Sequence, residues 1–336
     1  MRSCLEICLE CIKEGGPFTF VDVGAMGGIP HKWKQLEGAM KVIAFEPDER
    51  AFSKLEKRNG IRWYNNALHS KSDELAFYVS RDPGKSSVFK PDFRFLSGFE
   101  DASRFDTVDR KVFPKEKVKC LDDIMAGNRI GDVDFVKIDV QGNELAILEG
   151  SRKNVLPGLF GIQLEVEFAG LYEKQPLFRD VDRFLSAEGF QLMDISRCYW
   201  KRKDYYDYPG KGQLTFGDAL YFKTAEGMQT QWGSLDAQLD LPSKVYKSII
   251  TCIVYGMFDY AMFLVNDAVQ RQIIQLDQYQ LIKDAIVWES RKGYLPEFWG
   301  KEFICKVLNR LLEKMGRRSY LGWADRDRMI GNVRDL

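Results

Sequence analysis

The first 225 residues alternate between short apolar runs and segments in which apolar residues recur every three or four positions. The runs at 19–23, 41–45 and 134–140 are rich in valine, isoleucine and phenylalanine, a pattern typical of parallel strands buried on both faces. Strands that alternate with helices predict a mostly parallel sheet with helices on both of its faces. We therefore expect a Rossmann-like α/β domain over residues 1–225, built on a seven-stranded sheet.

The same patterns place the remaining elements of this domain. Further strands are expected at 61–64, 75–79, 118–120, 159–168, 190–200 and 218–223. Helices are expected at 1–14, after Pro30, at 48–57, after Gly142 and at 177–188. Residues 80–113 show no sustained period and hold six phenylalanines. A long aromatic loop of this kind either packs on the body or forms a lid over a substrate.

The chain changes character after residue 225. Residues 226–243 are polar with glycine, serine and proline and predict a linker. From 244 the pattern is helical, with helices expected at 244–256, 259–272, 277–291 and 298–315. We expect residues 244–336 to form a helical accessory domain with a solvent-exposed tail.

Composition narrows the class of protein. Lys+Arg and Asp+Glu both total 49, so nothing indicates a general nucleic-acid binder, which is usually basic. The apolar run at 248–265 contains Gly256 and Asp259 and fits a buried helix better than a membrane span, with peripheral membrane contact as the alternative. The charged amino-terminal segment is unlike an export signal, so we expect a cytoplasmic protein with reduced cysteines. A homodimer is left open.

Three of the seven cysteines, Cys4, Cys8 and Cys11, are spaced like the cluster-binding motif of radical S-adenosylmethionine enzymes. No strand precedes them, whereas that motif follows a barrel strand. The same offsets put three small side chains on one face of a helix. We predict the helix rather than a cluster site.

Candidate chemistry begins at the turn after the first strand. Gly24, Gly27 and Gly28 follow that strand directly, and Glu46 ends the next strand about 20 positions later. Glycines let the backbone approach a ligand at the carboxyl ends of parallel strands, and such an acid can hold ribose hydroxyls. The turn therefore predicts a nucleoside-bearing cofactor. It lacks the G-x-G-x-x-G spacing, which disfavours a NAD-dependent oxidoreductase.

Two later acids are candidates for catalysis. Asp139 stands near the end of the 134–140 strand, and Glu165 shares one face of the 159–168 strand with Gln163 and Glu167. Carboxylates on an interior strand are costly unless that face opens on a site. A helix cap for Asp139, or a salt bridge from Glu165 or Glu167 to Lys137 or Arg179, is the structural alternative.

Several segments, in order, resemble the FkbM-type family of class I S-adenosylmethionine-dependent methyltransferases. They are VDVGAMGG (21–28), AFEPDE (44–49), NNAL (65–68), residues 84–87, DFVKIDVQGNELAILEGS (134–151) and IQLEVEF (162–168). The 134–151 segment is the most diagnostic because the family carries a similar K-I-D-x-x-G-x-E pattern there. The resemblance stops before residue 226.

The resemblance implies S-adenosyl-L-methionine as cofactor and a role for each matching residue. Those implied to bind the cofactor are Asp22, Gly24, Ala25, Gly28, Glu46, Asn66 and Ala67. Asp139 and Glu144 match the acids of the fourth-strand segment. Met26 departs from the glycine or asparagine that is frequent in the middle of the turn.

The resemblance implies an O-methyltransferase whose partner is a hydroxyl-bearing glycan, glycolipid or natural product. A hydroxyl must lose its proton as the methyl group is transferred, and Asp139 is the first candidate for this role, with Glu165 second. Hard cations take oxygen ligands, but no histidine or Asp-rich cluster supports a metal between these two acids, so none is predicted. A single histidine beside the turn, His31, fits a solvated side chain better than a base. The alternative function is a non-catalytic interaction protein that keeps the fold.

Overall fold

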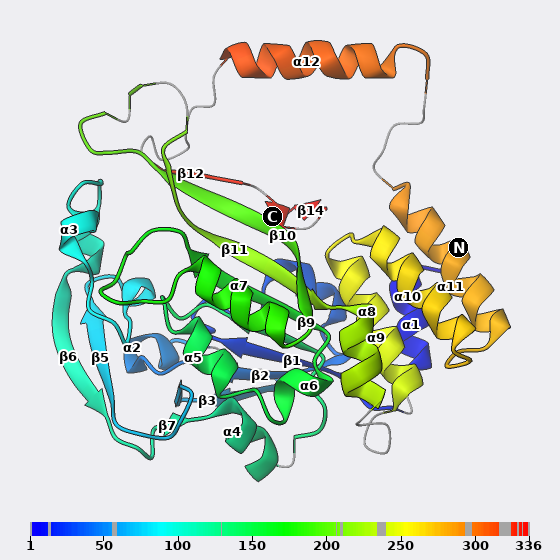
Figure 1. Cartoon of the computed structure of the whole chain (residues 1–336), viewed down its shortest axis with the longest axis horizontal. Coiled ribbons are helices and arrows are strands. Elements are labelled where there is room, and N and C mark those ends of the chain that lie inside the picture. Colours follow the sequence, from blue (N-terminus) through cyan, green and yellow to red (C-terminus); the bar gives the residue numbers. More distant parts are fainter. Residues whose placement is uncertain are drawn as a thin grey trace.

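An eight-stranded sheet runs through the middle of the molecule in this computed structural model (Figure 1). The structure describes residues 2–12, 15–55, 59–128, 130–205, 207–208, 211–233, 240–292, 298–315, 324–327, 329–330 and 332–334. The sheet has the order β12-β10-β11-β9-β8-β1-β2-β3. Its strands are β1 (Phe18–Val23), β2 (Met40–Phe45), β3 (Ile61–Tyr64), β8 (Phe135–Ile138), β9 (Gly161–Glu167), β10 (Phe190–Trp200), β11 (Gln213–Lys223) and β12 (Ala324–Arg326).

Five neighbouring strands of this sheet are parallel. β9, β8, β1, β2 and β3 run in one direction, whereas β11, β10 and β12 each pair antiparallel to their neighbours. The predicted seven-stranded, mostly parallel sheet is confirmed, and β12 adds a short eighth strand. β1 pairs with β2 on one side and with β8 on the other. Such a switch point opens a crevice at the carboxyl ends of the strands.

Helices cover both faces of the sheet. One face carries α4 (Leu121–Gly127), α5 (Glu144–Glu149), α6 (Val155–Gly158) and α7 (Phe178–Ala187), and the other carries α1 (Cys4–Cys11), the 3-10 turn η1 (His31–Leu36) and α9 (Leu241–Val254). Along β1, Val21 and Val23 pack in the core on the side of α4 to α7. Phe18 and Phe20 pack in the core on the opposite side, with α1, η1 and α9. All six residues of β1 are buried, as expected of a strand covered on both faces.

The helices after residue 240 pack directly against the sheet. Ile249 and Ile250 of α9 share a core cluster with Phe20, Trp33 and Phe135. The next helices are α10 (Phe258–Gln270), α11 (Leu276–Ser290) and α12 (Lys301–Met315). The boundaries of the accessory domain stay predictions, but its first helices and the sheet have one core.

The expected linker is structured where it is described. α8 (Ala225–Gly227) and the π-helical turn η4 (Met228–Trp232) follow β11. Met228 and Trp232 are buried in the core cluster that also contains α9. Residues 234–239 of the expected linker lie outside the described residues.

Residues 80–113 were expected to form a long aromatic loop, but they contain three short helical turns and a strand. They hold η2 (Pro83–Lys85), α3 (Phe93–Leu96), η3 (Ala102–Phe105) and β6 (Thr107–Phe113), and β6 pairs with β5 (Leu75–Ser80). All residues of β6 except Phe113 are exposed. The strand therefore carries no alternation of apolar and polar residues that a sequence could reveal.

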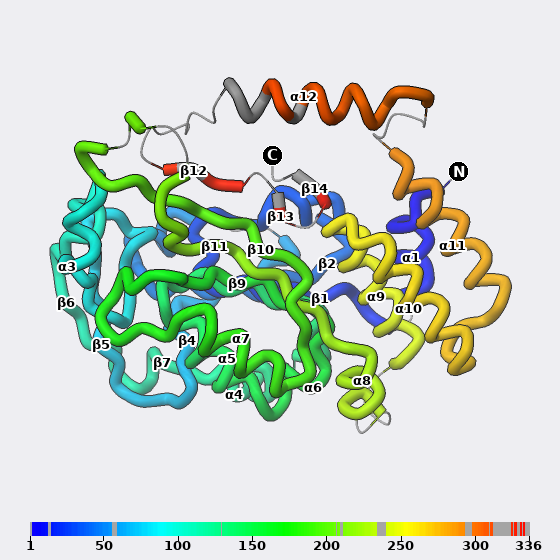
Figure 2. The backbone as a smooth tube through the Cα atoms, turned by 45° about the horizontal axis from the view of Figure 1, so that its top comes forward, coloured from blue at the N-terminus to red at the C-terminus, as the bar shows by residue number. Residues whose placement is uncertain are grey.

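The remaining short elements frame the sheet. They are α2 (Glu49–Phe52), β4 (Ala67–Leu68), β7 (Val118–Lys119), β13 (Met329–Ile330) and β14 (Val333–Arg334). The expectation of a solvent-exposed tail holds for Arg326, which keeps 53% of its side chain exposed, but not for Ile330, which is buried; β12 also pairs with β10. Figure 2 shows β12 lying along the open side of β10.

The amino-terminal cysteines lie on a helix, as predicted. Ser3 and Glu6 form a capping box that begins α1. Cys4 and Cys8 are buried against the core, and all seven cysteines are unpaired. Their spacing is explained by the face that α1 turns inward.

Candidate functional site

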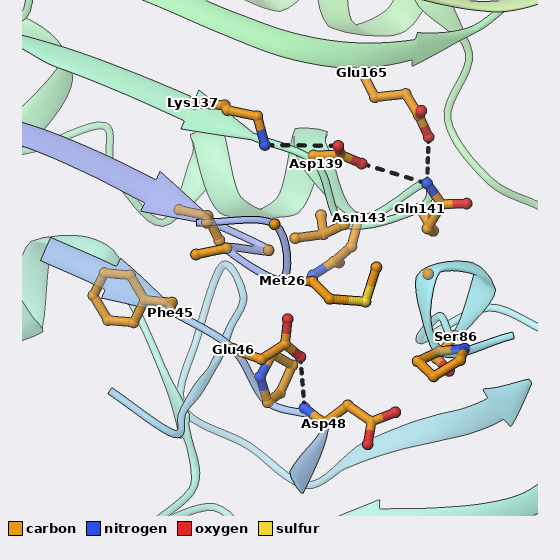
Figure 3. Close-up of a pocket in the computed structure, with 18 of the residues that line it drawn as sticks. Met26, Phe45, Glu46, Asp48, Ser86, Lys137, Asp139, Gln141, Asn143 and Glu165 are labelled. Atoms are coloured by element: carbon orange, nitrogen blue, oxygen red, sulfur yellow. Dashed lines mark hydrogen bonds and ion pairs between the residues drawn. The ribbon is translucent and has the colours of Figure 1, made fainter. Parts of the chain in front are cut away.

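A cavity of about 770 Å³ lies at the carboxyl ends of β1, β2 and β8 (Figure 3). It has two sides. The turn side consists of Gly24–Pro30, Glu46, Asn66–Leu68 and Asn143, and the acid side consists of Lys85, Arg104, Lys137, Asp139, Gln141, Glu165, Phe216 and Arg326. A cavity of this size can enclose a small-molecule cofactor together with part of a second ligand.

On the turn side, the backbone is held where only glycine fits. Gly24 has a φ of +80°, and a Cβ there would lie 1.9 Å from the carbonyl oxygen of Asp139. The Gly24 N–H donates to the Phe45 carbonyl at 2.9 Å, and the Asp139 N–H donates to the Val23 carbonyl at 2.9 Å. These bonds hold the ends of β1, β2 and β8 together and leave no room for a side chain.

Gly27 and Gly28 have the opposite surroundings. A Cβ built on either would meet no atom within 4 Å, and Gly28 has a φ of +73°. Their backbone therefore faces open space. A ligand such as a sugar can therefore approach the backbone of the turn closely, because no side chain stands in between.

Glu46 projects from the end of β2 into the cavity (Figure 3). Its Oε1 accepts a hydrogen bond from the Asp48 N–H at 2.8 Å. Burial raises the pKa of Glu46 to about 7. A carboxylate in this position can accept hydrogen bonds from two adjacent hydroxyls, so the site fits a ribose.

Met26 reaches across the cavity from the turn. Its side chain points toward the 83–86 turn in Figure 3, and a Cβ at Gly84 would lie 3.1 Å from the Met26 Cε. Met26 keeps 46% of its surface exposed. Its flexible thioether therefore lies between the two sides without closing either.

On the acid side, Asp139 lies in a chain of opposite charges. Lys137 Nζ is 3.6 Å from Asp139 and 3.5 Å from the buried Asp22. Burial acts to raise the pKa of Asp139, but Lys137, Lys85 and the Gln141 amide lower it below its ordinary value. Asp139 is thereby held as a carboxylate facing the cavity.

Glu165 is held in the opposite state. Burial raises its pKa to about 8, and the charge of Asp139 acts in the same direction. Gln141 lies between the two acids, and its Nε2 donates to Glu165 at 2.5 Å and to Asp139 at 3.4 Å (Figure 3). Two carboxyl groups with separated pKa values are suited to different roles in proton transfer.

Gln141 connects the acids to the rest of this side. Its Oε1 accepts from Lys85 Nζ at 3.0 Å and from the Tyr172 hydroxyl at 3.1 Å. Its backbone has a φ of 60°, and its carbonyl accepts from the Ser87 hydroxyl at 2.7 Å. These contacts fix the amide so that both of its N–H bonds point at carboxyl oxygens.

A cation from the carboxyl-terminal segment completes the wall. Arg326 of β12 lines the cavity and forms an ion pair with Asp218 of β11. The segment is fixed by a bond from Asp327 N–H to the Arg197 carbonyl at 2.9 Å and by an ion pair between Asp327 and Arg197 at 2.8 Å. The acid side therefore depends on a residue far along the chain.

The structure brings most of the candidate residues together. Gly24, Ala25, Gly28, Glu46, Asn66, Ala67, Asp139 and Glu165 all line the cavity. Asp22 and Glu144 do not. Asp22 lies behind the lining against Lys137, and the Glu144 Oε1 accepts from the Val140 N–H at 3.0 Å, which closes the turn below the site.

The structural alternatives for the acids are not what is observed. The cap residue of α5 is Asn143, not Asp139. Lys137 pairs with Asp22 and Asp139, and Arg179 pairs with Asp180. His31 lines the cavity near the turn.

Sequence reasoning missed Gln141, Lys85 and Arg326. Gln141 lies in the turn that was expected before α5. The sequence predicted the turn but not the contacts of the Gln141 side chain. Lys85 lies on the aromatic loop, and Arg326 lies in a tail without pattern. Only the position of Gln141, next to a glycine at the end of a parallel strand, carried a signal that could have been used.

Within the described ranges, no group of three or more His, Cys, Asp or Glu side chains is arranged to hold a metal ion. The Gln141 amide, a hydrogen-bond donor, fills the space between Asp139 and Glu165.

Comparison with known proteins identifies the region that builds the site. A model described as the methyltransferase FkbM domain matches residues 22–192, about half of the chain. Among solved structures, human methyltransferase-like protein 13 in complex with SAH is 10% identical, with 92% of this chain and 96% of that one covered and a TM-score of 0.33. A precorrin-6y C5,15-methyltransferase from Geobacter metallireducens is 11% identical, with 65% and 87% covered and a TM-score of 0.32. No curated protein matches the chain in sequence.

Proposed function

Because the chain belongs to the methyltransferase FkbM domain family, we propose that it transfers a methyl group from S-adenosylmethionine to a hydroxyl oxygen. The acceptor would be a glycan, a glycolipid or a natural product. The observation that carries the proposal is the single cavity in which a glycine turn and Glu46 face a pair of carboxyl groups with separated pKa values.

The turn side would hold the cofactor. Gly24, Ala25 and Gly28 would lie beside the methionine and ribose, Glu46 would accept from the ribose hydroxyls, and Asn66 and Ala67 would lie beside the adenine. When bound, S-adenosylmethionine supplies an electrophilic methyl group, so the protein has mainly to align the nucleophile with it.

The acid side would hold the acceptor hydroxyl. Its oxygen would form the new O–CH3 bond as the S–CH3 bond breaks, and its proton would pass to a carboxylate. The sequence puts Asp139 first as the base, but its lowered pKa makes it a weak one, whereas Glu165 has a pKa of about 8. We therefore propose that Glu165 removes the proton in the fraction of molecules in which it is ionised, a fraction that grows as pH rises toward 8, and that Asp139 orients the hydroxyl.

Isothermal titration calorimetry with S-adenosylhomocysteine tests the cofactor assignment. The wild-type protein should bind, and Glu46→Gln should weaken binding by about tenfold or more because charged hydrogen bonds to the ribose are lost. Glu49→Gln, an exposed acid three positions later with 72% of its side chain exposed, should bind as the wild type. Absence of heat with both S-adenosylmethionine and S-adenosylhomocysteine would overturn the proposal.

Mass spectrometry of surface glycans tests the acceptor class. A strain without the gene should lose one CH2 increment of mass for each missing methyl group, and a strain carrying Glu165→Gln should lose the same groups. Unchanged glycan masses would count against a glycan acceptor. Normal biological activity of an Asp139→Asn strain would instead favour the non-catalytic alternative.

A further inference from the structure

α12 lies apart from the sheet and from the other helices in both views of the molecule (Figures 1 and 2). Its apolar side chains are exposed, with exposed fractions of 71% for Phe303, 53% for Leu308 and 52% for Leu311. None of the described residues of α12 belongs to a core cluster. The apolar face of this helix is therefore uncovered in the protein alone.

The exposed apolar residues form one continuous stripe. Phe303, Ile304, Val307, Leu308 and Leu311 follow one another at spacings of one and three positions, so they share a face of the helix. Two further exposed aromatic residues, Phe298 and Trp299, precede the helix. Aromatic side chains at the end of an amphipathic helix are typical anchors at a membrane–water interface.

Charge distinguishes this stripe from a face made for another protein. α12 contains four basic and two acidic residues, although the whole chain is neutral. Lys306 and Arg310 follow Phe303 by three and seven positions and so border the stripe. Basic residues beside an apolar stripe complement a surface of anionic lipid headgroups.

A second copy of the chain fits this helix less well. Pairing two stripes would bring the basic borders of both copies together, and like charges disfavour such a contact. The helix is about 22 Å long at 1.5 Å per residue, too short to cross a bilayer. In the part of the chain that the structure describes, no helix has the length and apolarity of a membrane span.

We propose that α12 binds in the plane of a membrane surface rich in anionic lipid, with Phe303, Leu308 and Leu311 inserted among the acyl chains. The next described element along the chain after α12 is β12, whose Arg326 lines the cavity. The inference does not depend on the proposed methyl transfer.

Co-sedimentation of the full chain with vesicles tests the inference. The wild-type protein should bind vesicles of phosphatidylcholine with 30% phosphatidylglycerol as an added probe, about tenfold or more tighter than vesicles of phosphatidylcholine alone. Phe303→Asp should reduce binding to the mixed vesicles by about tenfold or more, because the phenylalanine that inserts among the acyl chains is lost and a negative charge is gained. Arg310→Gln should reduce it by about fivefold, and higher salt should weaken it further.

Leu276→Asp is the matched control. Leu276 is 70% exposed on α11, so its replacement adds the same charge to another exposed apolar position and should leave vesicle binding unchanged. Equal binding to neutral and mixed vesicles, or wild-type binding by Phe303→Asp, would overturn the inference. A wild-type dimer that Phe303→Asp converts to a monomer, without vesicle binding by either, would also overturn it and identify a second copy as the occupant.

Discussion

Among single residues, the site depends on the Gln141 amide, which lies between two acids that differ in pKa, Asp139 and Glu165. Gln141 donates to Glu165 and Asp139 at once, while Lys137 lies on the far side of Asp139. Asp139 therefore stays ionised and Glu165 holds its proton up to about pH 8. The sequence identified both acids but not the amide, because hydrogen bonding by a turn residue depends on a backbone φ that no spacing reveals.

The raised pKa of Glu165 predicts how stability changes with pH. Its pKa is about 8 in the folded protein against an ordinary value of 4.5, so the folded state binds more protons between these values. Stability should therefore fall as pH rises from 5 to 9. In urea unfolding without cofactor, Glu165→Gln should lose less stability over this range than the wild type.

Other buried acids keep part of this fall in the variant. Burial also raises the pKa values of Glu46 and Glu144 to about 7 and that of Glu167 well above its ordinary value, so the variant still loses stability as pH rises. Glu74→Gln, at an exposed position, should behave as the wild type. Equal losses in Glu165→Gln and in the wild type would show that Glu165 titrates normally.

At the scale of elements, α9 is fixed to the sheet by buried charges. Lys244 Nζ contacts Asp132, the Val133 carbonyl at 2.8 Å and Asp134 at 3.0 Å. Asp134 in turn accepts from the Thr19 N–H at 2.7 Å, at the start of β1. The network connects a helix that begins at residue 241 with the first strand of the fold.

Removal of this lysine should therefore cost more than a surface lysine. Lys244→Met leaves buried carboxylates with one cation fewer, and we expect a loss of about 3 kcal/mol or more in the free energy of unfolding at pH 7. Lys306→Met, on the exposed side of α12, should change it by less than about 0.5 kcal/mol. Similar values for the two variants in urea unfolding would mean that the network adds no net stability.

Burial and length decide which elements the sequence predicted. Buried strands such as β1 and β8 have apolar runs because both faces are covered. β9 is also buried but alternates apolar and polar residues, and Glu165 on its polar face lines the cavity. β6 is almost wholly exposed, and β12 spans three residues. β6 has no buried face to impose a period and β12 is too short to show one, so pairing with a neighbouring strand decides their conformation and a linear pattern does not.

At the scale of the whole molecule, the cavity is built from distant parts of the chain. The turn side comes from residues before 70 together with Asn143, while the acid side ends at Arg326. The ion pair of Arg326 with Asp218 joins positions 108 residues apart. The family match ends at residue 192, so the Arg326–Asp218 pair lies beyond the matched region, whereas Asp139, Gln141 and Glu165 lie within it.

The division into two sides predicts that an Arg326 variant loses stability but keeps its affinity for the cofactor. Arg326→Met should leave the affinity for S-adenosylhomocysteine within about twofold of the wild type, because the turn side is intact. It should lower stability by about 1–3 kcal/mol, since Asp218 loses its partner in a buried position. Adding Asp218→Asn should restore most of that stability, and the double-mutant cycle measures the coupling. Loss of cofactor affinity in Arg326→Met would contradict the division into two sides.

The late position of Arg326 also bears on the order in which a growing chain acquires its parts. Synthesis runs from the amino terminus, so every turn-side residue and Glu165 leave the ribosome before α9 and long before β12. A nascent chain that already contains residues 22–192 could shape the cofactor turn but would still lack one wall of the acid side. The site would therefore be complete for methylation only after the last of the lining residues had been made and β12 had paired with β10.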